Sequence, residues 1–195
     1  MTGSHVLRDA MTRCLAASPQ ARGFDVAVRD HVASLPLDWQ TLAPIVEDLV
    51  RGVQEELESD DRCKERKHAH RAWVRGFVTA CAQGGLRGER ALVPLTHLTL
   101  LTCYDEGIML RVFASSLGYG VGQAWAEISG DEAERKAWLA AMQAGVREGL
   151  KALAEDASEP DPELTASESR ILGALERGYG LGGFLTTWTP WRSRP

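Results

Sequence analysis

The chain has 195 residues, of which 44% are hydrophobic, 25% charged and 7% aromatic. Its 22 Lys and Arg residues stand against 27 Asp and Glu residues, which gives a formal net charge of -5. These values are typical of one soluble globular domain and exclude a collagen-like, a mostly disordered or a strongly basic protein. A chain of this length buries roughly 70% of the surface of its unfolded form, so a core can form without disulfides or metals.

The cysteine pattern and the N-terminus indicate a cytoplasmic protein. Cys14, Cys63, Cys81 and Cys103 are widely spaced and form no C-x-x-C pair, which is typical of free thiols in a reducing compartment. The N-terminus has no basic segment followed by a long apolar one, so no signal peptide is predicted. The longest uncharged apolar stretch, 91–104, is too short for a membrane span, which needs about 20 apolar residues.

Apolar residues recur at helical spacing almost throughout the chain, which predicts an all-α bundle of about six to eight helices. We expect two short helices over the apolar stripes that end at Leu15 and Leu35, the second stopped by Pro36. A third helix carries the apolar stripe of 42–57, with Thr41 as its cap.

The middle of the chain predicts two longer helices. The first spans 61–83 and ends at a pair of glycines. The second spans 90–117 and is apolar nearly all round, as expected of the central helix of a bundle. Its alternative is a strand, because 96–102 is rich in Thr and Leu, but the apolar pattern is too long for a typical strand.

The C-terminal part predicts a helix over 131–153, an acidic linker with two prolines, and a short helix opened by a capping box. The chain ends in a tail rich in Gly and Trp. The expected organisation is a bundle over 1–154, a linker over 155–163 and a C-terminal appendage over 164–195. This appendage is expected to pack on the bundle or on a partner.

Two glycine-rich segments resemble each other, Gly-Tyr-Gly-Val-Gly at 118–122 and Gly-Tyr-Gly-Leu-Gly at 178–182. Each follows a predicted helix, where Gly is the common C-terminal cap, so we interpret both as helix ends. Close helix packing through these glycines is the alternative. A phosphate-cradling loop would need a strand before the glycines, and none is predicted there.

The charge reverses between two neighbouring segments. Residues 47–61 contain seven carboxylates and one cation, whereas 62–75 contain six cations and one carboxylate. Four of these cations share one helical face: Lys64, Lys67, Arg71 and Arg75. Such a face can bind phosphates or an acidic partner. The alternative is an internal role, in which the acidic and basic helices pair with each other, and charge runs are more often solvated or weakly paired.

A second cluster, of candidate metal ligands, depends on how two predicted helices pack against each other. If the helices of 61–83 and 90–117 form a hairpin, four candidate metal ligands come together: Glu65, His68, Asp105 and Glu106. A Glu-x-x-His motif is used by carboxylate-bridged metal centres in helical bundles. A complete centre of that kind has two such motifs, and this chain has one. The competing interpretation is that the two carboxylates of the second helix pair with basic residues of the first.

No nucleophile elbow, Walker loop, His-Glu-x-x-His motif or EF-hand loop is present, so enzymatic activity is not favoured. The preferred function is a non-catalytic interaction or regulatory protein that self-associates or binds another protein. It would use the basic face of 62–75 together with Trp188 and Trp191, since Trp and Arg are favoured interface residues. The alternative is a metal-dependent enzyme or small-molecule-binding bundle, with a divalent metal as its cofactor. Nucleic-acid binding through 62–75 ranks third, because the chain as a whole is acidic.

Overall fold

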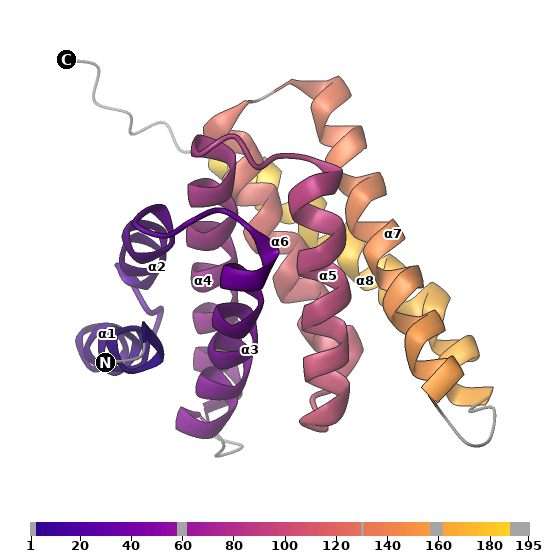
Figure 1. The fold of residues 1–195 in the computed structure, drawn as a ribbon, viewed down its shortest axis with the longest axis horizontal. Helices are drawn as coiled ribbons and strands as arrows, with labels where there is room; N and C mark the ends of the chain where they lie inside the picture. The colour runs from indigo at the N-terminus through magenta and orange to yellow at the C-terminus, as the bar shows by residue number, and fades with distance from the viewer. Residues whose placement is uncertain (1–2, 58–61, 130, 157–161, 188–195) are drawn as a thin grey trace.

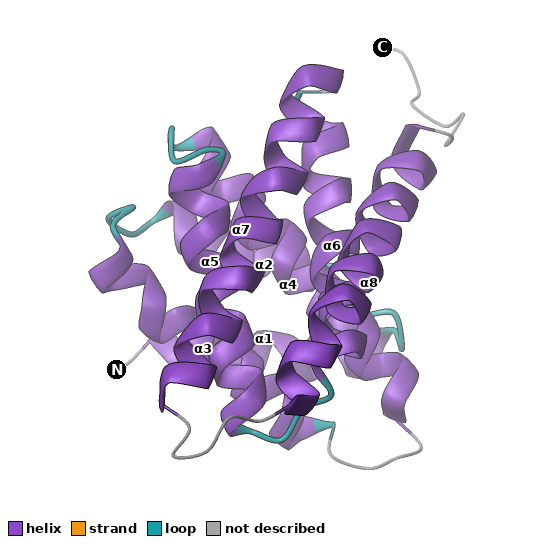
Figure 2. Ribbon diagram, turned by 90° about the vertical axis from the view of Figure 1, so that its right-hand side faces the viewer, coloured by secondary structure: helices purple, strands orange, loops and turns teal. Residues whose placement is uncertain are grey.

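The computed structural model describes residues 3–57, 62–129, 131–156 and 162–187. Within these ranges the chain forms eight helices and no strand (Figure 2). They are α1 (Gly3–Ala17), α2 (Phe24–Ala33), α3 (Trp39–Glu56), α4 (Cys63–Gln83), α5 (Glu89–Asp105), α6 (Leu110–Ile128), α7 (Glu132–Asp156) and α8 (Pro162–Thr187). The all-α bundle predicted from the apolar spacing is therefore confirmed.

The helices are arranged in two layers. One layer contains α2, α4, α6 and α8, and the other contains α1, α3, α5 and α7. Consecutive helices alternate between the layers, so the chain forms four stacked hairpins that run from α1–α2 to α7–α8 (Figure 1).

Helices α6 and α8, which are neighbours within one layer, run parallel to each other. In the contact of α6 with α8, Gly178 lies against Ser115 and Gly182 lies against Tyr119, so both chains advance in the same direction. The contact of α5 with α7 follows the same rule in the other layer.

Glycines set the close approach of α6 and α8. A Cβ atom on Gly178 or Gly182 would overlap a backbone carbonyl oxygen of α6, and one on Gly118 would overlap that of Leu175 in α8. Interpreting 118–122 and 178–182 as helix ends is therefore wrong, because both segments lie inside their helices. Glycine costs a helix interior about 0.5–1 kcal/mol, and the backbone contact it permits offsets this cost here.

The single helix predicted over 90–117 is wrong as well, because the chain turns back between α5 and α6. Gly107 adopts a positive φ of 64°. The Ile108 amide donates to the carbonyl of Cys103 at 2.7 Å, which closes the end of α5 in the manner of a Schellman motif. A left-handed glycine therefore splits one long apolar pattern into two antiparallel helices.

The predicted linker and appendage also differ in their boundaries. Helix α7 extends to Asp156 and α8 begins at Pro162, so both ends of 155–163 are helical and only 157–161 lies outside the described residues. The helix predicted to be short spans 26 residues. It packs along α6 within its own layer and also contacts α7 of the other layer.

Aromatic residues fill the core on the α4 side. Trp73 is fully buried and donates its Nε1–H to Nδ1 of His70 at 3.1 Å. The imidazole of His70 also lies edge-on to the ring of Phe113 in α6, with ring centroids 4.8 Å apart. These contacts join α4 to α6, and they satisfy one nitrogen of a buried histidine.

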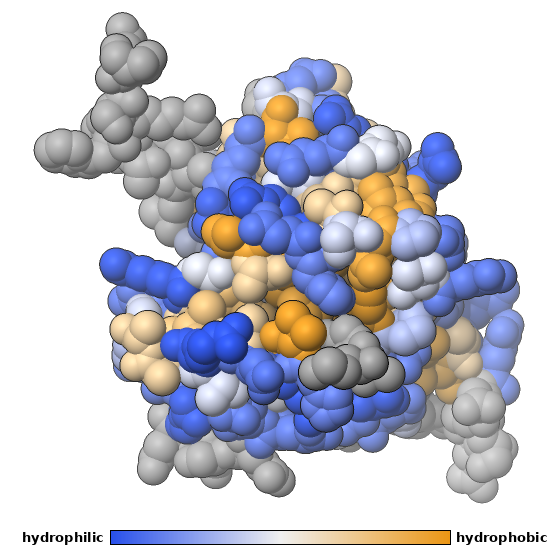
Figure 3. Space-filling view, turned by 60° about the vertical axis from the view of Figure 1, so that its left-hand side comes forward, coloured by the Kyte–Doolittle hydropathy of each residue, from blue (hydrophilic) through white to orange (hydrophobic). Residues whose placement is uncertain are grey.

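The outer surface is mainly hydrophilic on the side of α1 and α2, with smaller hydrophobic areas between the polar residues (Figure 3). Val6 and Val26 are the large hydrophobic side chains of α1 and α2 that are exposed. Scattered single residues of this kind are normal on protein surfaces. Within the described ranges, no helix combines the length and the apolar character that crossing a membrane requires.

Candidate functional site: a basic groove on α4, α6 and α8

Four cations converge where α4, α6 and α8 meet. They surround a hollow of about 240 Å³, which we call the basic groove. Its cations are Lys67 and Arg71 from α4, Arg111 from α6 and Arg177 from α8. The other lining residues are Val112, Ser115, Ser116 and Ala174. No Asp, Glu or His is among the described residues that line this groove, so the charged groups among them are all positive.

Backbone contacts at glycines place these cations. Lys67 and Arg71 are one turn apart on α4, which puts them on the same helical face. A Cβ on Gly120 of α6 would lie 2.8 Å from the carbonyl oxygen of Arg71, so α4 and α6 approach closely at this level. The contact of Gly178 with Ser115 brings the neighbouring Arg177 towards α6 in the same way. The groove therefore depends on the packing of all three helices.

The four cations have no carboxylate partner within the described part of the chain. Among the residues that the structure describes, no ion pair involves Lys67, Arg71, Arg111 or Arg177. The guanidinium of Arg71 instead stacks over the ring of Tyr119, 4.2 Å from its centroid. Its Nε atom is buried and has no hydrogen-bond partner. Like charges gathered in this way repel each other, and an anion in the groove relieves that repulsion.

Two serine hydroxyls line the groove, and that of Ser115 adds a neutral donor. Ser116 donates to the carbonyl of Val112 across a long distance of 3.4 Å. For the hydroxyl of Ser115, which is half-buried, the described part of the chain holds no hydrogen-bond partner. Arg111 is the second residue of α6, so the positive end of that helix dipole lies at this end of the groove. All of these features favour an anionic group.

A second hollow, of about 350 Å³, lies beside the basic groove and shares Arg71 with it. Its walls come from α4, α6 and the segment 20–25 that leads into α2. His68 lines this second hollow, and burial together with the charge of Arg71 lowers the pKa of its imidazole. His68 is therefore neutral at pH 7 and adds no positive charge to this surface.

Arg75 is partly buried, lines the second hollow and belongs to a framework of ion pairs between helices. It forms ion pairs with Glu127 of α6 and, at 3.3 Å, with Asp25 of α2. These pairs connect three helices of one layer. Of the four cations predicted to share an interaction face, Lys67 and Arg71 line the basic groove, and Lys64 is exposed near the start of α4 outside its lining.

The acidic residues of α3 find partners near their own helix. Glu47 pairs with Arg51 on α3, and Glu55 pairs with Arg8 on α1 at 2.6 Å. Helix α4 reaches α3 through a hydrogen bond of Arg66 to Gln54 at 3.4 Å. The structure thus shows carboxylates of the acidic segment engaged with α1 and with α3 itself.

The four candidate metal ligands occupy separate environments. Glu65 pairs with Arg62 at 2.6 Å, and Glu106 pairs with Arg51 at 2.8 Å. Asp105, at the end of α5, is exposed. The hairpin assumed for these ligands is wrong, because α4 packs mainly against α2 and α6 whereas α5 packs mainly against α3 and α7. Across the described ranges, no group of three or more His, Cys, Asp and Glu side chains is placed to hold a metal ion.

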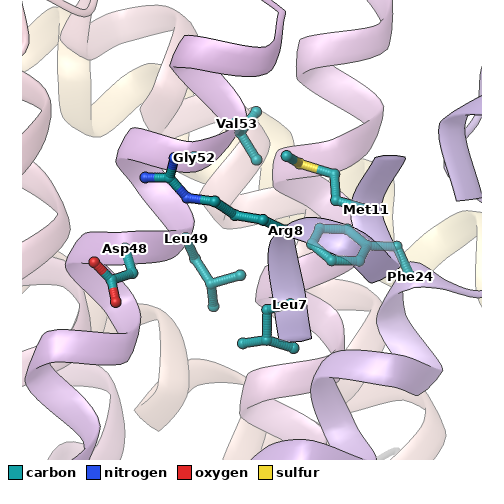
Figure 4. Close-up of a pocket in the computed structure, with 8 residues that line it drawn as sticks. All are labelled: Leu7, Arg8, Met11, Phe24, Asp48, Leu49, Gly52 and Val53. Atoms are coloured by element: carbon teal, nitrogen blue, oxygen red, sulfur yellow. The ribbon is translucent and has the colours of Figure 1, made fainter. Parts of the chain in front are cut away.

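A small hollow between α1, α2 and α3 is a packing feature. Figure 4 shows the side chain of Arg8 extending from α1 towards Gly52 of α3, next to Met11 and Phe24. The free space is about 10 Å³, which is close to the minimum for one water molecule. This hollow is therefore too small to bind a ligand.

The sequence prediction of the site missed Arg111 and Arg177. Both lie on helices that are distant in sequence from α4, and only the packing of the layer brings them to the groove. The glycine pattern of 178–182 was the available signal, because it marks the contact that positions Arg177. The predicted tail residues Trp188 and Trp191 lie outside the described residues.

The sequence matches no protein-family model, and it has no significant similarity to a curated protein or to a solved structure. Relatives therefore give no functional information about this chain. The basic groove is interpreted from its own residues and geometry.

Proposed function

We propose that this protein is a non-catalytic interaction protein that binds an acidic segment of a partner protein through the basic groove. The observation that carries this proposal is the convergence on one hollow of four cations that have no ion pair among the described residues. Arg8, Arg51 and Arg75 have ion pairs within the chain. The exposed Arg13 and Arg90 have none among the described residues but lie outside the groove, so convergence on one hollow distinguishes the groove cations. Unpaired cations held together by tight helix packing are most simply explained by a partner that supplies the negative charge.

The lining chemistry supports binding without catalysis. Of the described residues that line the groove, Ser115 and Ser116 alone carry hydroxyl groups, and none is His, Asp, Glu or Cys. A serine without an adjacent base is a weak nucleophile. The groove thus provides donors and charge for recognition, whereas the groups that move protons are missing from its lining.

The charge distribution favours a protein partner over a nucleic acid. Nucleic-acid binding relies on many phosphate contacts along an extended basic surface. Here the cations converge on one hollow, while the chain carries a net charge of -5. A short acidic segment of a protein matches a small positive site of this kind.

The test compares two double variants with the same change in charge. Arg111→Glu with Arg177→Glu reverses two groove cations, and Arg13→Glu with Arg90→Glu reverses two exposed arginines outside the groove. Each pair lowers the net charge from -5 to -9, because each exchange removes one positive charge and adds one negative charge. Circular dichroism checks that both variants remain helical.

The probe is a fluorescent peptide rich in Glu, titrated at several salt concentrations. Wild-type protein and the Arg13/Arg90 variant are expected to bind it with similar affinity that falls as salt rises. The groove variant is expected to lose at least about tenfold in affinity, which corresponds to about 1.4 kcal/mol. Equal losses in both variants would show a nonspecific charge effect and contradict the proposal.

A second copy of this chain is one partner that fits, because the chain itself is acidic. Sedimentation velocity of the wild-type protein and the groove variant tests this case. A dimer that the groove variant loses and the Arg13/Arg90 variant keeps would identify self-association through the groove. A dimer that persists in both variants would assign self-association to another surface.

A further inference from the structure

We infer that the basic groove recognises one phosphoryl group, carried on a side chain of the partner protein. This inference rests on the proposed function and names the chemistry that the groove selects. The observation behind it is that Lys67, Arg71, Arg111 and Arg177 surround a single hollow of about 240 Å³.

The number of cations exceeds what one carboxylate can neutralise. An Asp or Glu side chain brings one negative charge, whereas a phosphorylated side chain carries a charge of about -1.5 to -2 and three acceptor oxygens at neutral pH. Four cations around one hollow therefore match a phosphoryl group better than an isolated carboxylate. A run of several carboxylates brings the same charge, but it spreads that charge over a longer segment than the hollow.

The donor types also suit phosphate. Three of the four cations are arginines, whose planar guanidinium groups donate two parallel hydrogen bonds to phosphate oxygens. The hydroxyl of Ser115 and the positive end of α6 lie along the same groove. A tetrahedral anion with several acceptors can use donors that come from three helices, because its oxygens point in different directions.

Arg71 is placed to respond to such a ligand. Its guanidinium stacks on Tyr119, but its Nε atom is buried without a hydrogen-bond partner. An unmade hydrogen bond at a buried donor is costly, so a small rotation of Arg71 towards a phosphoryl oxygen is favourable. Arg71 lines both hollows, so it is part of the wall of the basic groove.

The size of the groove favours a group attached to a larger molecule over a free nucleotide. Pockets that enclose drug-sized ligands have volumes of roughly 300–1,000 Å³. At about 240 Å³ the basic groove is smaller than this range. It therefore suits a single charged group that projects from a partner, while the rest of the partner lies on the surface of α4, α6 and α8.

The experiment uses three peptides that differ only at their central residue, which is phosphoserine, serine or glutamate. Each contains flanking Glu and Gly residues, and binding to the full chain is measured by fluorescence anisotropy at constant ionic strength. Wild-type protein is expected to bind the phosphoserine peptide at least about tenfold more tightly than the glutamate peptide, and the serine peptide most weakly. Inorganic phosphate is the fourth probe and is expected to compete weakly.

Two variants test whether the groove provides this preference. Arg177→Lys keeps the charge and removes the guanidinium fork, so it is expected to reduce the preference for phosphoserine while leaving binding of the glutamate peptide nearly unchanged. Arg90→Lys makes the same exchange on an exposed residue outside the groove and is expected to change neither value. Both exchanges are conservative and affect exposed side chains, so neither is expected to disturb folding.

The peptide affinities distinguish the phosphoryl inference from the proposed function. Equal affinity for the phosphoserine and glutamate peptides would overturn the phosphoryl inference and leave the proposed acidic-partner function standing. Absence of binding to all three peptides would contradict both. Inorganic phosphate that competes as strongly as the phosphoserine peptide would identify a free-phosphate site and overturn the inference.

Discussion

Gly178 of α8 lies directly against the backbone carbonyl of Ser115 in α6, so this contact sets the separation of the two helices that carry Arg177 and Arg111. Arg177 lines the groove and is the sequence neighbour of Gly178, which makes this contact. The packing of α8 against α6 therefore also determines the shape of the basic groove, and the two can be tested together.

Replacing Gly178 with alanine is expected to destabilise the protein. The added Cβ overlaps the carbonyl oxygen of Ser115, so α8 must shift away from α6, at a cost of about 1–3 kcal/mol. The matched control is Gly180→Ala, because a Cβ on Gly180 in the same helix meets no atom within 4 Å. The control is expected to gain about 0.5–1 kcal/mol from helix propensity. Urea unfolding measures both values, and a Gly178→Ala variant as stable as its control would contradict the close contact.

Replacing Arg75 with methionine is expected to lower the free energy of unfolding by about 1–3 kcal/mol. The exchange leaves Asp25 and Glu127, which are both partly buried, without their shared cation. Lys64→Met removes an exposed cation of the same helix and is expected to change stability by less than about 0.5 kcal/mol. Thermal and urea unfolding distinguish the two. Similar stability in both variants would mean that Arg75 is not part of the framework.

Neutralising the groove is expected to stabilise the free protein while it weakens binding. Arg111→Gln with Arg177→Gln removes repulsion among four like charges, and we expect a gain of a few tenths to about 1 kcal/mol. This gain should shrink as salt increases, because screening already reduces the repulsion in the wild type. Arg13→Gln with Arg90→Gln is the control at exposed positions outside the groove. A groove variant that is less stable than this control would indicate that the four cations have partners within the chain.

The helices themselves are predictable from sequence because their signal is local. Apolar residues three or four apart identify an amphipathic helix without knowledge of its neighbours. The break at Gly107 was missed because the apolar pattern of α5 continues into α6. The glycines of 118–122 and 178–182 were misinterpreted for a related reason, since a helix-ending glycine and a helix-packing glycine look alike until the contacting helix is known.

The residues of the candidate site also differ in whether local sequence spacing predicts their role. Lys67 and Arg71 were predicted together because their spacing on one helix suffices to place them on one face. Arg75 was grouped with them, although it faces Asp25 and Glu127 on neighbouring helices. No spacing rule within α4 distinguishes these outcomes. Whether a cation of α4 forms an ion pair depends on the side chains of the helices that pack beside it.

The buried His70 is expected to make the protein less stable in acid. Burial lowers the pKa of its imidazole from 6.5 to about 3, so the folded state keeps it neutral where the unfolded state takes up a proton. The contribution of His70 is therefore complete above about pH 6.5 and is lost progressively as the pH falls towards 3, by at most about 1.4 kcal/mol per pH unit. Urea unfolding between pH 7 and pH 4 measures this slope.

His70→Gln separates this effect from the protonation of surface carboxylates. The amide oxygen of glutamine can still accept the hydrogen bond from Nε1 of Trp73, but it does not titrate. The variant loses the ring contact with Phe113 and is expected to be less stable at pH 7, with a shallower decline in acid than the wild type. His5→Gln, at an exposed position on α1, is expected to retain the wild-type slope. If His70→Gln declines as steeply as His5→Gln, the acid sensitivity originates at another group and not at the buried imidazole.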